Sequence, residues 1–140
     1  MARFTVTYTC NAESAEKEMV VLLVVDDEPA ITQLLTDVLE YHGHPVMIAN
    51  DAEAALDILA LRRPEMIMVD LMMPGMDGLS LAMALRHHPA VKHVPLVAMS
   101  ASDSSLDLAA RKGDFDAYLS KPFETETLLN LVDRYSKVAS

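Results

Sequence analysis

The sequence MIMVDLMMPGMDG, residues 66–78, carries the clearest structural pattern of this chain. Four apolar residues lead to Asp70, and a proline and two glycines follow within the next eight positions. A short apolar run that is preceded by Pro64 and followed by such a turn is typical of a strand buried in a parallel sheet. The pattern therefore places Asp70 at the carboxyl end of a central strand, where open α/β sheets bind their ligands.

A second apolar run supports a functional role for Asp70, because an aspartate at a strand end often only begins a turn. Residues 20–25 (VVLLVV) are followed at once by Asp26 and Asp27. If these two parallel strands end side by side, they bring three carboxylates together, which is costly unless a cation is present. The two runs together predict a cation site at Asp26, Asp27 and Asp70.

Composition limits the classes of protein that this chain fits. A length of 140 residues suits one domain, and a formal net charge of −10 argues against a nucleic-acid or anionic membrane partner. The single cysteine, Cys10, cannot form an internal disulfide, which fits a reducing cytoplasm. The sequence has neither the pattern of a signal peptide nor an apolar stretch long enough to span a membrane. We therefore expect a cytoplasmic protein.

Strand and helix patterns alternate along the chain. Apolar runs predict strands at residues 20–25, 46–49, 66–70, 95–99 and 117–119. Helical spacing of apolar residues follows each of them, with starts at Pro29, near Asp51 and at Gly78, and with later helices through Leu106 and Leu128. Strict alternation predicts an α/β fold, a doubly wound five-stranded parallel sheet flanked by five helices.

The domain boundaries follow from the same patterns. Residues 19–138 carry all five strand–helix pairs. Residues 1–18 stand apart, and we interpret them as a loosely held N-terminal tail, since termini are poorly ordered unless they are tied down. The alternation of Phe4, Val6 and Tyr8 with threonines leaves a second interpretation open, an edge strand or a contact with another chain.

Ser100 and Lys121 follow the last two strands and therefore lie at the same edge of the sheet as the acids. Mg²⁺ typically binds one or two carboxylates together with phosphate oxygens. A lysine supplies a point charge for a phosphoryl oxygen, and a serine supplies a hydroxyl donor. These groups suit the stabilisation of a phosphoryl group during transfer, and a carboxylate such as Asp70 can accept it as an acyl phosphate.

At these residues the sequence resembles the response-regulator receiver family, the CheY-like phosphoacceptor domains of two-component signalling. Four motifs carry the resemblance in order and at domain-length spacing: VLLVVDDEP, MIMVDLMMPGMDG, PLVAMSA and YLSKPF. It extends from about Met19 to Val138 and implies the flavodoxin-like strand order 2-1-3-4-5. It also implies a signalling domain and not an enzyme, one that catalyses only its own phosphorylation and dephosphorylation.

The resemblance implies a role for each acid. Asp70 is the expected phosphoacceptor and a metal ligand. Asp27 is expected to bind Mg²⁺ directly and Asp26 through water, and the backbone carbonyl of Met72 completes the protein ligands. In this family the residue two positions after the phosphoacceptor, here Met72, also borders the path of the water that hydrolyses the phosphate.

The resemblance also implies the groups that respond to phosphorylation. Ser100 and Lys121 are expected to contact the phosphoryl group, and Tyr118 occupies the aromatic switch position. The Lys121–Pro122 bond is expected to be cis. A histidine kinase or a histidine phosphotransfer protein is the implied donor. The downstream partner and a homodimer are left open by the sequence, as is the choice between a stand-alone receiver and a part of a longer protein.

Other function classes fit less well. A phosphohydrolase of the haloacid dehalogenase type expects a second acid two residues after its nucleophile, where this chain has Met72. A nucleotide- or flavin-binding module expects a glycine-rich loop after the first strand, where this chain has DDEPA. A receiver that binds partners without phosphorylation usually lacks one of the acids or the lysine. The Mg²⁺-dependent phosphohydrolase and the phosphorylation-independent binding module remain the alternatives.

Overall fold

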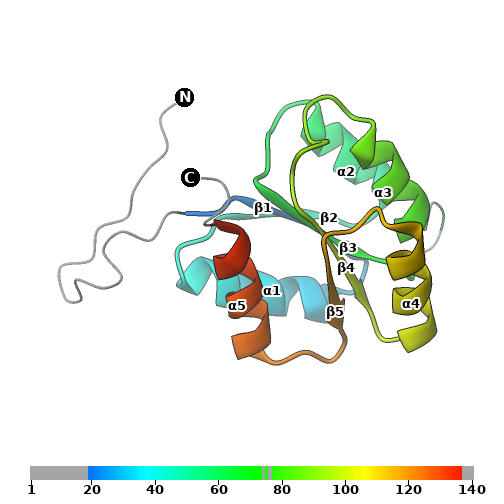
Figure 1. Cartoon of the computed structure of the whole chain (residues 1–140). Coiled ribbons are helices and arrows are strands. Elements are labelled where there is room, and N and C mark those ends of the chain that lie inside the picture. The colour runs from blue at the N-terminus through cyan, green and yellow to red at the C-terminus, as the bar shows by residue number, and fades with distance from the viewer. Residues whose placement is uncertain (1–18, 74, 76, 137–140) are drawn as a thin grey trace.

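The computed structural model describes residues 19–73, 75 and 77–136. The predicted tail or edge element at residues 1–18 lies outside the described residues, and so do residues 137 and 138 at the predicted end of the domain. Strands and helices alternate along the described chain (Figure 1): β1 (Leu22–Val25), α1 (Pro29–Tyr41), β2 (Val46–Ala49), α2 (Ala52–Leu59), β3 (Met66–Asp70), α3 (Gly78–Arg86), β4 (Leu96–Ser100), α4 (Asp103–Lys112), β5 (Ala117–Ser120) and α5 (Thr125–Ser136).

The five strands form one parallel sheet in the order β2-β1-β3-β4-β5, which confirms the predicted fold class and strand order. Val25 of β1 lies opposite Val69 of β3, and Val69 lies opposite Ala98 of β4. The carboxyl ends of the three central strands are therefore level with one another. The chain winds outward in opposite directions from β1 and β3, so the carboxyl ends of this pair form the switch point at which such sheets bind ligands.

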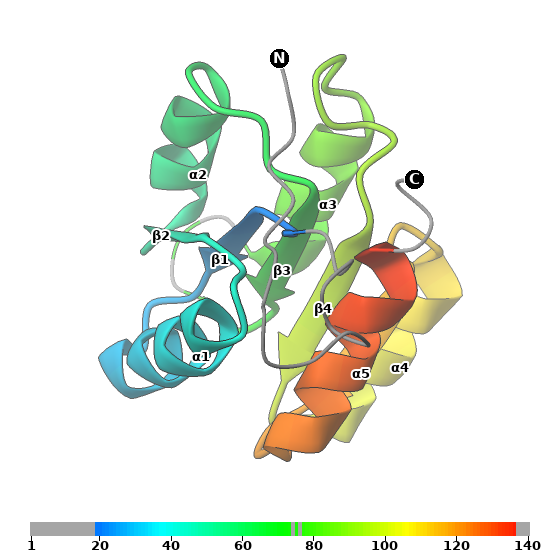
Figure 2. The same ribbon diagram turned by 90° about the vertical axis from the view of Figure 1, so that its left-hand side faces the viewer.

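Helices cover both faces of the sheet, α1 and α5 on one side and α2, α3 and α4 on the other (Figures 1 and 2). Along β1, Leu22 and Val24 pack towards α1 and α5, whereas Leu23 and Val25 pack towards the other helices. All four side chains are fully buried, which explains why this strand is a continuous apolar run. No helix in the described ranges has both the length and the hydropathy needed to cross a bilayer.

Local side chains fix the helix ends. Asp51, Asp77 and Ser102 each accept a hydrogen bond from a backbone N–H in the first turn of α2, α3 and α4. Pro29 begins α1, as predicted, at a position where its missing N–H leaves no helical bond unmade. Gly113 ends α4 with φ of 76°, a left-handed conformation that glycine adopts without steric cost.

Strand β1 begins at Leu22, two residues later than the pattern predicted. Its neighbour β2 begins opposite Leu22, so the sheet offers no earlier partner on that side. Side chains accept the hydrogen bonds of the two preceding amides instead. His44 Nδ1 accepts one from the Val20 amide at 3.0 Å, and Glu65 Oε1 accepts one from the Val21 amide at 3.1 Å.

Strand β4 runs one residue later than the predicted 95–99. Pro95 has no N–H to donate, and contributes only its carbonyl, which accepts a hydrogen bond from the Ile67 amide at 3.0 Å. At the other end Ser100 pairs with Ser120 of β5, so both strands continue one residue further than predicted.

Arg86 ties the amino ends of β4 and β5 to the end of α3. Its Nε donates to the Asp114 carbonyl at 2.7 Å, and its Nη1 donates to the Val94 carbonyl at 3.1 Å. Its Nη2 lies 2.6 Å from Asp116 Oδ2, which also accepts a hydrogen bond from the Leu96 amide. This charged network holds the sheet at the edge opposite Asp70.

Gly78 allows α3 to begin directly against the end of β3. A Cβ atom at this position would lie 2.7 Å from the Asp70 carbonyl oxygen and 2.8 Å from Leu71 Cα. Both contacts are with backbone, which cannot move aside cheaply. The absence of a side chain at Gly78 therefore lets the loop after Asp70 turn back tightly over the sheet edge.

Candidate functional site

The three predicted acids meet at the carboxyl edge of the sheet. Asp26 directly follows β1 and Asp70 ends β3, and these two strands are paired. One carboxylate oxygen from each of Asp26, Asp27 and Asp70 lies within 4.8 Å of the others. Asp26 and Asp70 are buried, whereas Asp27 is exposed. The predicted convergence of three carboxylates is therefore confirmed.

Lys121 places a positive charge among these acids. Its Nζ lies 2.7 Å from Asp26 Oδ2, 3.0 Å from Glu28 Oε1 and 3.5 Å from Asp70 Oδ2. The Lys121 side chain is only 8% exposed, so the pairs with Asp26 and Asp70 are largely shielded from water. The pattern of acids alone predicts that a bound cation relieves the repulsion between the carboxylates, whereas in the structure Lys121 supplies part of this relief.

Burial and neighbouring charges alter the proton affinity of both central groups. Burial raises the pKa of Asp70 above its ordinary value, and the Asp26 carboxylate raises it further. The Met72 amide, 3.1 Å from Asp70 Oδ1, and the Lys121 ammonium act in the opposite direction without cancelling the rise. For Lys121, burial lowers the pKa, but hydrogen bonds to Asp26 and Glu28 outweigh this effect and leave the pKa raised.

The donor set fits Mg²⁺. All three ligand groups are carboxylates, the hard oxygen donors that Mg²⁺ prefers. Two oxygens bound to one Mg²⁺ are at most about 4.2 Å apart, since each lies about 2.1 Å from the ion. The three carboxylate oxygens lie within 4.8 Å of one another, close to this limit, so all three acids can face one ion. The oxygens of Asp26 also accept hydrogen bonds from the Glu28 amide and from Lys121 Nζ.

Met72 lies beside Asp70 through its backbone. Its amide donates to Asp70 Oδ1, which holds this part of the loop against the acids. The Met72 side chain points outward and is 62% exposed. Its sulfur accepts a hydrogen bond from Ser105 Oγ at 3.4 Å, so the loop after β3 touches the first turn of α4.

Ser100 and Pro122 complete the edge. Asp70 lies opposite Met99 in the sheet, so Ser100 is one residue further along the same edge. Ser100 is fully buried, and its Oγ accepts a hydrogen bond from the Ser102 amide at 3.0 Å. The Lys121 amide donates to the Ser100 carbonyl at 2.8 Å, and the Lys121–Pro122 peptide bond is cis.

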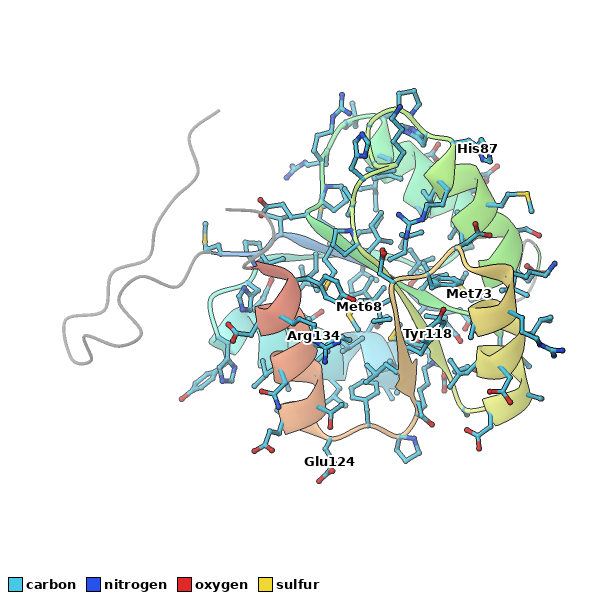
Figure 3. The ribbon with its side chains drawn as sticks, viewed as in Figure 1. Met68, Met73, His87, Tyr118, Glu124 and Arg134 are labelled. Atoms are coloured by element: carbon cyan, nitrogen blue, oxygen red, sulfur yellow. The ribbon has the colours of Figure 1, made fainter. Side chains whose placement is uncertain are left out.

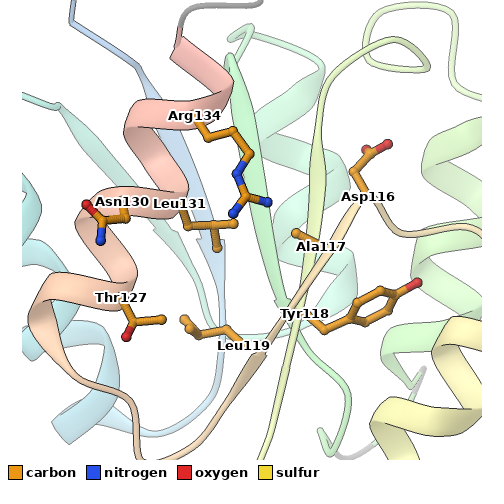
Figure 4. A pocket seen from close by; sticks show the side chains of 8 residues that line it. All are labelled: Asp116, Ala117, Tyr118, Leu119, Thr127, Asn130, Leu131 and Arg134. Carbon is orange, nitrogen blue, oxygen red and sulfur yellow. The ribbon is translucent and has the colours of Figure 1, made fainter.

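Tyr118 faces away from α5 (Figures 3 and 4). Ala117 and Leu119 are buried on the α5 side of β5, so the side chain between them projects from the opposite face of the strand. The Tyr118 hydroxyl donates to the Phe115 carbonyl at 3.4 Å, and the two rings make an edge-to-face contact. The hydrogen bond and ring contact described for Tyr118 are thus with Phe115 and not with the acids.

A separate hollow of about 440 Å³ lies between β5 and α5 (Figure 4). Thr127, Asn130 and Arg134 of α5 line one wall of this hollow, and Asp116 lies at its end. Asp26, Asp27 and Asp70 are not among the residues that line it.

Glu28 is a site residue that the sequence pattern does not predict. After β1 the pattern indicates an acid pair followed by the start of a helix, and it assigns no role to the third acid. The structure pairs its carboxylate with Lys121 at 3.0 Å. The run of three acids before Pro29 was a usable signal, because three adjacent carboxylates repel one another unless a cation lies close to them.

Comparisons with known proteins agree with this geometry. The family model described as response regulator receiver domain matches residues 22–133. Response regulator MprA of Mycolicibacterium vanbaalenii is 39% identical over 109 residues, which cover 77% of this chain and 46% of that protein. Response regulator MprA of Mycobacterium avium is 38% identical, over 77% of this chain and 47% of its own length. The chain thus spans about half the length of the curated relatives it matches.

Solved structures give the same result. The receiver domain of Francisella response regulator 1452 has a TM-score of 0.77 and 31% identity, over 86% of this chain and 99% of its own. Chemotaxis protein CheY4 of Vibrio cholerae also scores 0.77, with 29% identity over 84% and 98% of the two chains. The receiver domain of sensor histidine kinase PA1611 from Pseudomonas aeruginosa, which holds a magnesium ion in its active site cleft, is 24% identical over 85% and 98%, and shares the fold with a TM-score of 0.77.

The raised pKa of Asp70 predicts how stability changes with pH in metal-free protein. A carboxyl group with a raised folded-state pKa contributes stability that is fully present below its unfolded pKa and lost as pH rises through its folded pKa. Asp70→Asn keeps this stability at neutral pH, because the asparagine side chain remains uncharged there. We expect the variant to melt about 2–6 °C above wild type at neutral pH in EDTA, with a gain that vanishes in acid.

Thermal melts in EDTA across the acidic and neutral range measure this effect. Asp57→Asn is the matched control, because Asp57 is an exposed acid on α2 and the change in net charge is the same. A melting temperature of Asp70→Asn below that of wild type at neutral pH, or a gain that does not depend on pH, would contradict the prediction.

Proposed function

Because the chain belongs to the family of response regulator receiver domains, we propose that it is the phosphoacceptor of a two-component phosphorelay, with Asp70 as the residue phosphorylated. The observation that carries the proposal is the position of Asp70, which is buried between Asp26 and Lys121 at the switch point of the sheet. The donor is a histidine kinase or a histidine phosphotransfer protein. The domain comprises residues 19–138, works in the cytoplasm and catalyses no reaction beyond its own phosphorylation and dephosphorylation.

In the proposed transfer, a carboxylate oxygen of Asp70 attacks the phosphorus of a phosphohistidine. The new O–P bond forms as the N–P bond breaks, and the electron pair of the N–P bond stays on the imidazole nitrogen of the donor. The Met72 amide holds one Asp70 oxygen, which supports a fixed direction of attack. The Asp70 carboxylate is thereby consumed as an acyl phosphate, with one negative charge of the site replaced by those of the phosphoryl group.

Asp27 and Asp70 would hold Mg²⁺ directly, Asp26 would hold it through water, and the Met72 carbonyl would complete the protein ligands. When bound, Mg²⁺ neutralises charge on the acids and on the phosphoryl oxygens. The spacing and oxygen chemistry of the three acids support this assignment. The magnesium ion in the related Pseudomonas aeruginosa receiver domain adds to it.

Lys121 and Ser100 then stabilise the phosphoryl group and report its presence. The Lys121 ammonium lies 3.5 Å from Asp70 Oδ2, within reach of an oxygen attached there, which supports an ion pair with the phosphoryl group. Ser100 donates its hydroxyl hydrogen to a second phosphoryl oxygen. Its movement leaves room for Tyr118 to turn inward, which changes the surface that a downstream protein or a second copy of the chain recognises.

Phosphorylation by a small donor tests this function. Incubation with acetyl phosphate and Mg²⁺ is expected to add the mass of one phosphoryl group to wild type. Asp70→Asn should gain nothing, because it lacks the nucleophilic carboxylate, and EDTA should abolish the gain in wild type. Intact-mass spectrometry gives the readout, with Asp57→Asn as the control for a lost surface carboxylate. An adduct that persists in Asp70→Asn, or forms equally in EDTA, would overturn the proposal.

The lifetime of the phosphoryl group should depend on the Met72 side chain. A thioether is a weak acceptor and cannot orient an attacking water as an amide can. Met72→Asn should speed the loss of phosphate about 2–10-fold, the range of one neutral hydrogen bond, without weakening Mg²⁺ binding through the backbone carbonyl. Decay of phosphorylated protein after removal of the donor measures this. Met83→Asn, at an exposed methionine of α3, is the control. Equal rates of phosphate loss in the two variants would show that the Met72 side chain does not set the lifetime of the phosphoryl group.

A further inference from the structure

The carboxylate of Glu28 is a partner of Lys121 that the proposed chemistry does not use. Glu28 Oε1 lies 3.0 Å from Lys121 Nζ. The Glu28 side chain is 59% exposed, whereas the Lys121 side chain is 8% exposed. The pair therefore joins a group at the surface to a group inside the site.

Hydrogen bonds fix the backbone of Glu28, and its side chain binds Lys121. The Glu28 amide donates to Asp26 Oδ1 at 2.9 Å, and its carbonyl accepts hydrogen bonds from the Ile31 and Thr32 amides at the start of α1. Glu28 occupies the N-cap position of this helix, yet its side chain makes no capping hydrogen bond there. The described hydrogen bond of its carboxylate goes to Lys121 instead.

The ammonium group has three N–H donors to distribute. Asp26 Oδ2 takes one at 2.7 Å and Glu28 Oε1 takes another at 3.0 Å, while Asp70 Oδ2 stays at 3.5 Å. The Asp26 pair is buried, so breaking it would leave an uncompensated charge inside the protein. The Glu28 side chain is exposed, and an ion pair at such a position contributes little to stability because water can solvate the carboxylate when the pair breaks. Glu28 is therefore the partner that Lys121 can give up at the lowest cost.

We propose that Glu28 is a positioning residue. In the unphosphorylated domain its exposed carboxylate holds the Lys121 ammonium, and on phosphorylation it competes with the phosphoryl group for this ammonium. This inference rests on the proposed function, since it names what Lys121 leaves when Asp70 is phosphorylated. Glu28 thus opposes entry into the phosphorylated state and helps to restore the resting arrangement once the phosphate is lost.

Two substitutions separate the pair from simple charge. Glu28→Gln removes the charge and keeps the length of the side chain. Glu28→Asp keeps the charge but withdraws the carboxylate by one methylene group, beyond hydrogen-bonding reach of Lys121. Glu40→Gln, at an exposed acid of the same helix, is the control for net charge. If reach to Lys121 matters, Glu28→Asp behaves like Glu28→Gln, whereas if only charge matters it behaves like wild type.

The first readout is the affinity for beryllium trifluoride, a mimic of the phosphoryl group, at saturating Mg²⁺ in every variant. We expect both Glu28 variants to bind it about 2–5-fold more tightly than wild type, the range that an exposed ion pair supports. Glu40→Gln should bind it as wild type does. Unchanged or weaker binding in Glu28→Gln, or wild-type binding in Glu28→Asp, would overturn the proposal.

The second readout needs neither metal nor phosphate. In EDTA, the side-chain NMR signals of Lys121 should shift in both Glu28 variants and stay in place in Glu40→Gln. An unshifted Lys121 would overturn the proposal by showing that the pair does not form in solution. If wild type does not bind beryllium trifluoride at all, the proposed phosphoacceptor function is wrong, and so is the release of Lys121 from Glu28. If wild type binds it normally and the Glu28 variants bind it with the same affinity, only the proposed role of Glu28 is wrong.

Discussion

The buried ion pair between Lys121 and Asp26 is the interaction on which the site depends. These residues are 95 positions apart in the sequence, and their charged atoms lie 2.7 Å apart in the fold. The pair joins the loop after β5 to the end of β1 across the intervening strands β3 and β4. Without it, Asp26 and Asp70 would be two buried carboxylates close together with no cation from the described residues beside them, which is strongly unfavourable.

The parallel sheet makes this arrangement achievable. Its register brings the ends of β1 and β3 level, and the apolar residues of both strands exclude water up to the acids. Gly78 lets α3 begin against the Asp70 carbonyl, which keeps the loop that carries Met72 close to the cluster. At the opposite edge Arg86 fixes the starts of β4 and β5. The core thus determines where the charges lie, and the charges restrict how the loops can turn.

The sequence predicted much of this, because buried parallel strands leave a clear pattern of apolar runs that end in polar residues. Asp26, Asp27 and Asp70 were recognisable for that reason, whereas the strand order came from the resemblance to receivers and not from the pattern. The start of β1 was misplaced because its partner strand β2 begins only opposite Leu22, so the amides of Val20 and Val21 bind side chains that are distant in sequence, those of His44 and Glu65. The Glu28–Lys121 pair was missed because local periodicity does not show which way a side chain near a helix start will turn.

Three converging carboxylates and one lysine support Asp70 as the residue that carries the phosphoryl group. The most direct measurement is reduction of the phosphorylated protein with borohydride, which converts an aspartyl phosphate into homoserine, followed by peptide mapping. We expect homoserine at position 70 alone, and only in protein phosphorylated in the presence of Mg²⁺. Homoserine at position 26 or 27, or phosphate found on a serine or histidine with position 70 unmodified, would contradict it.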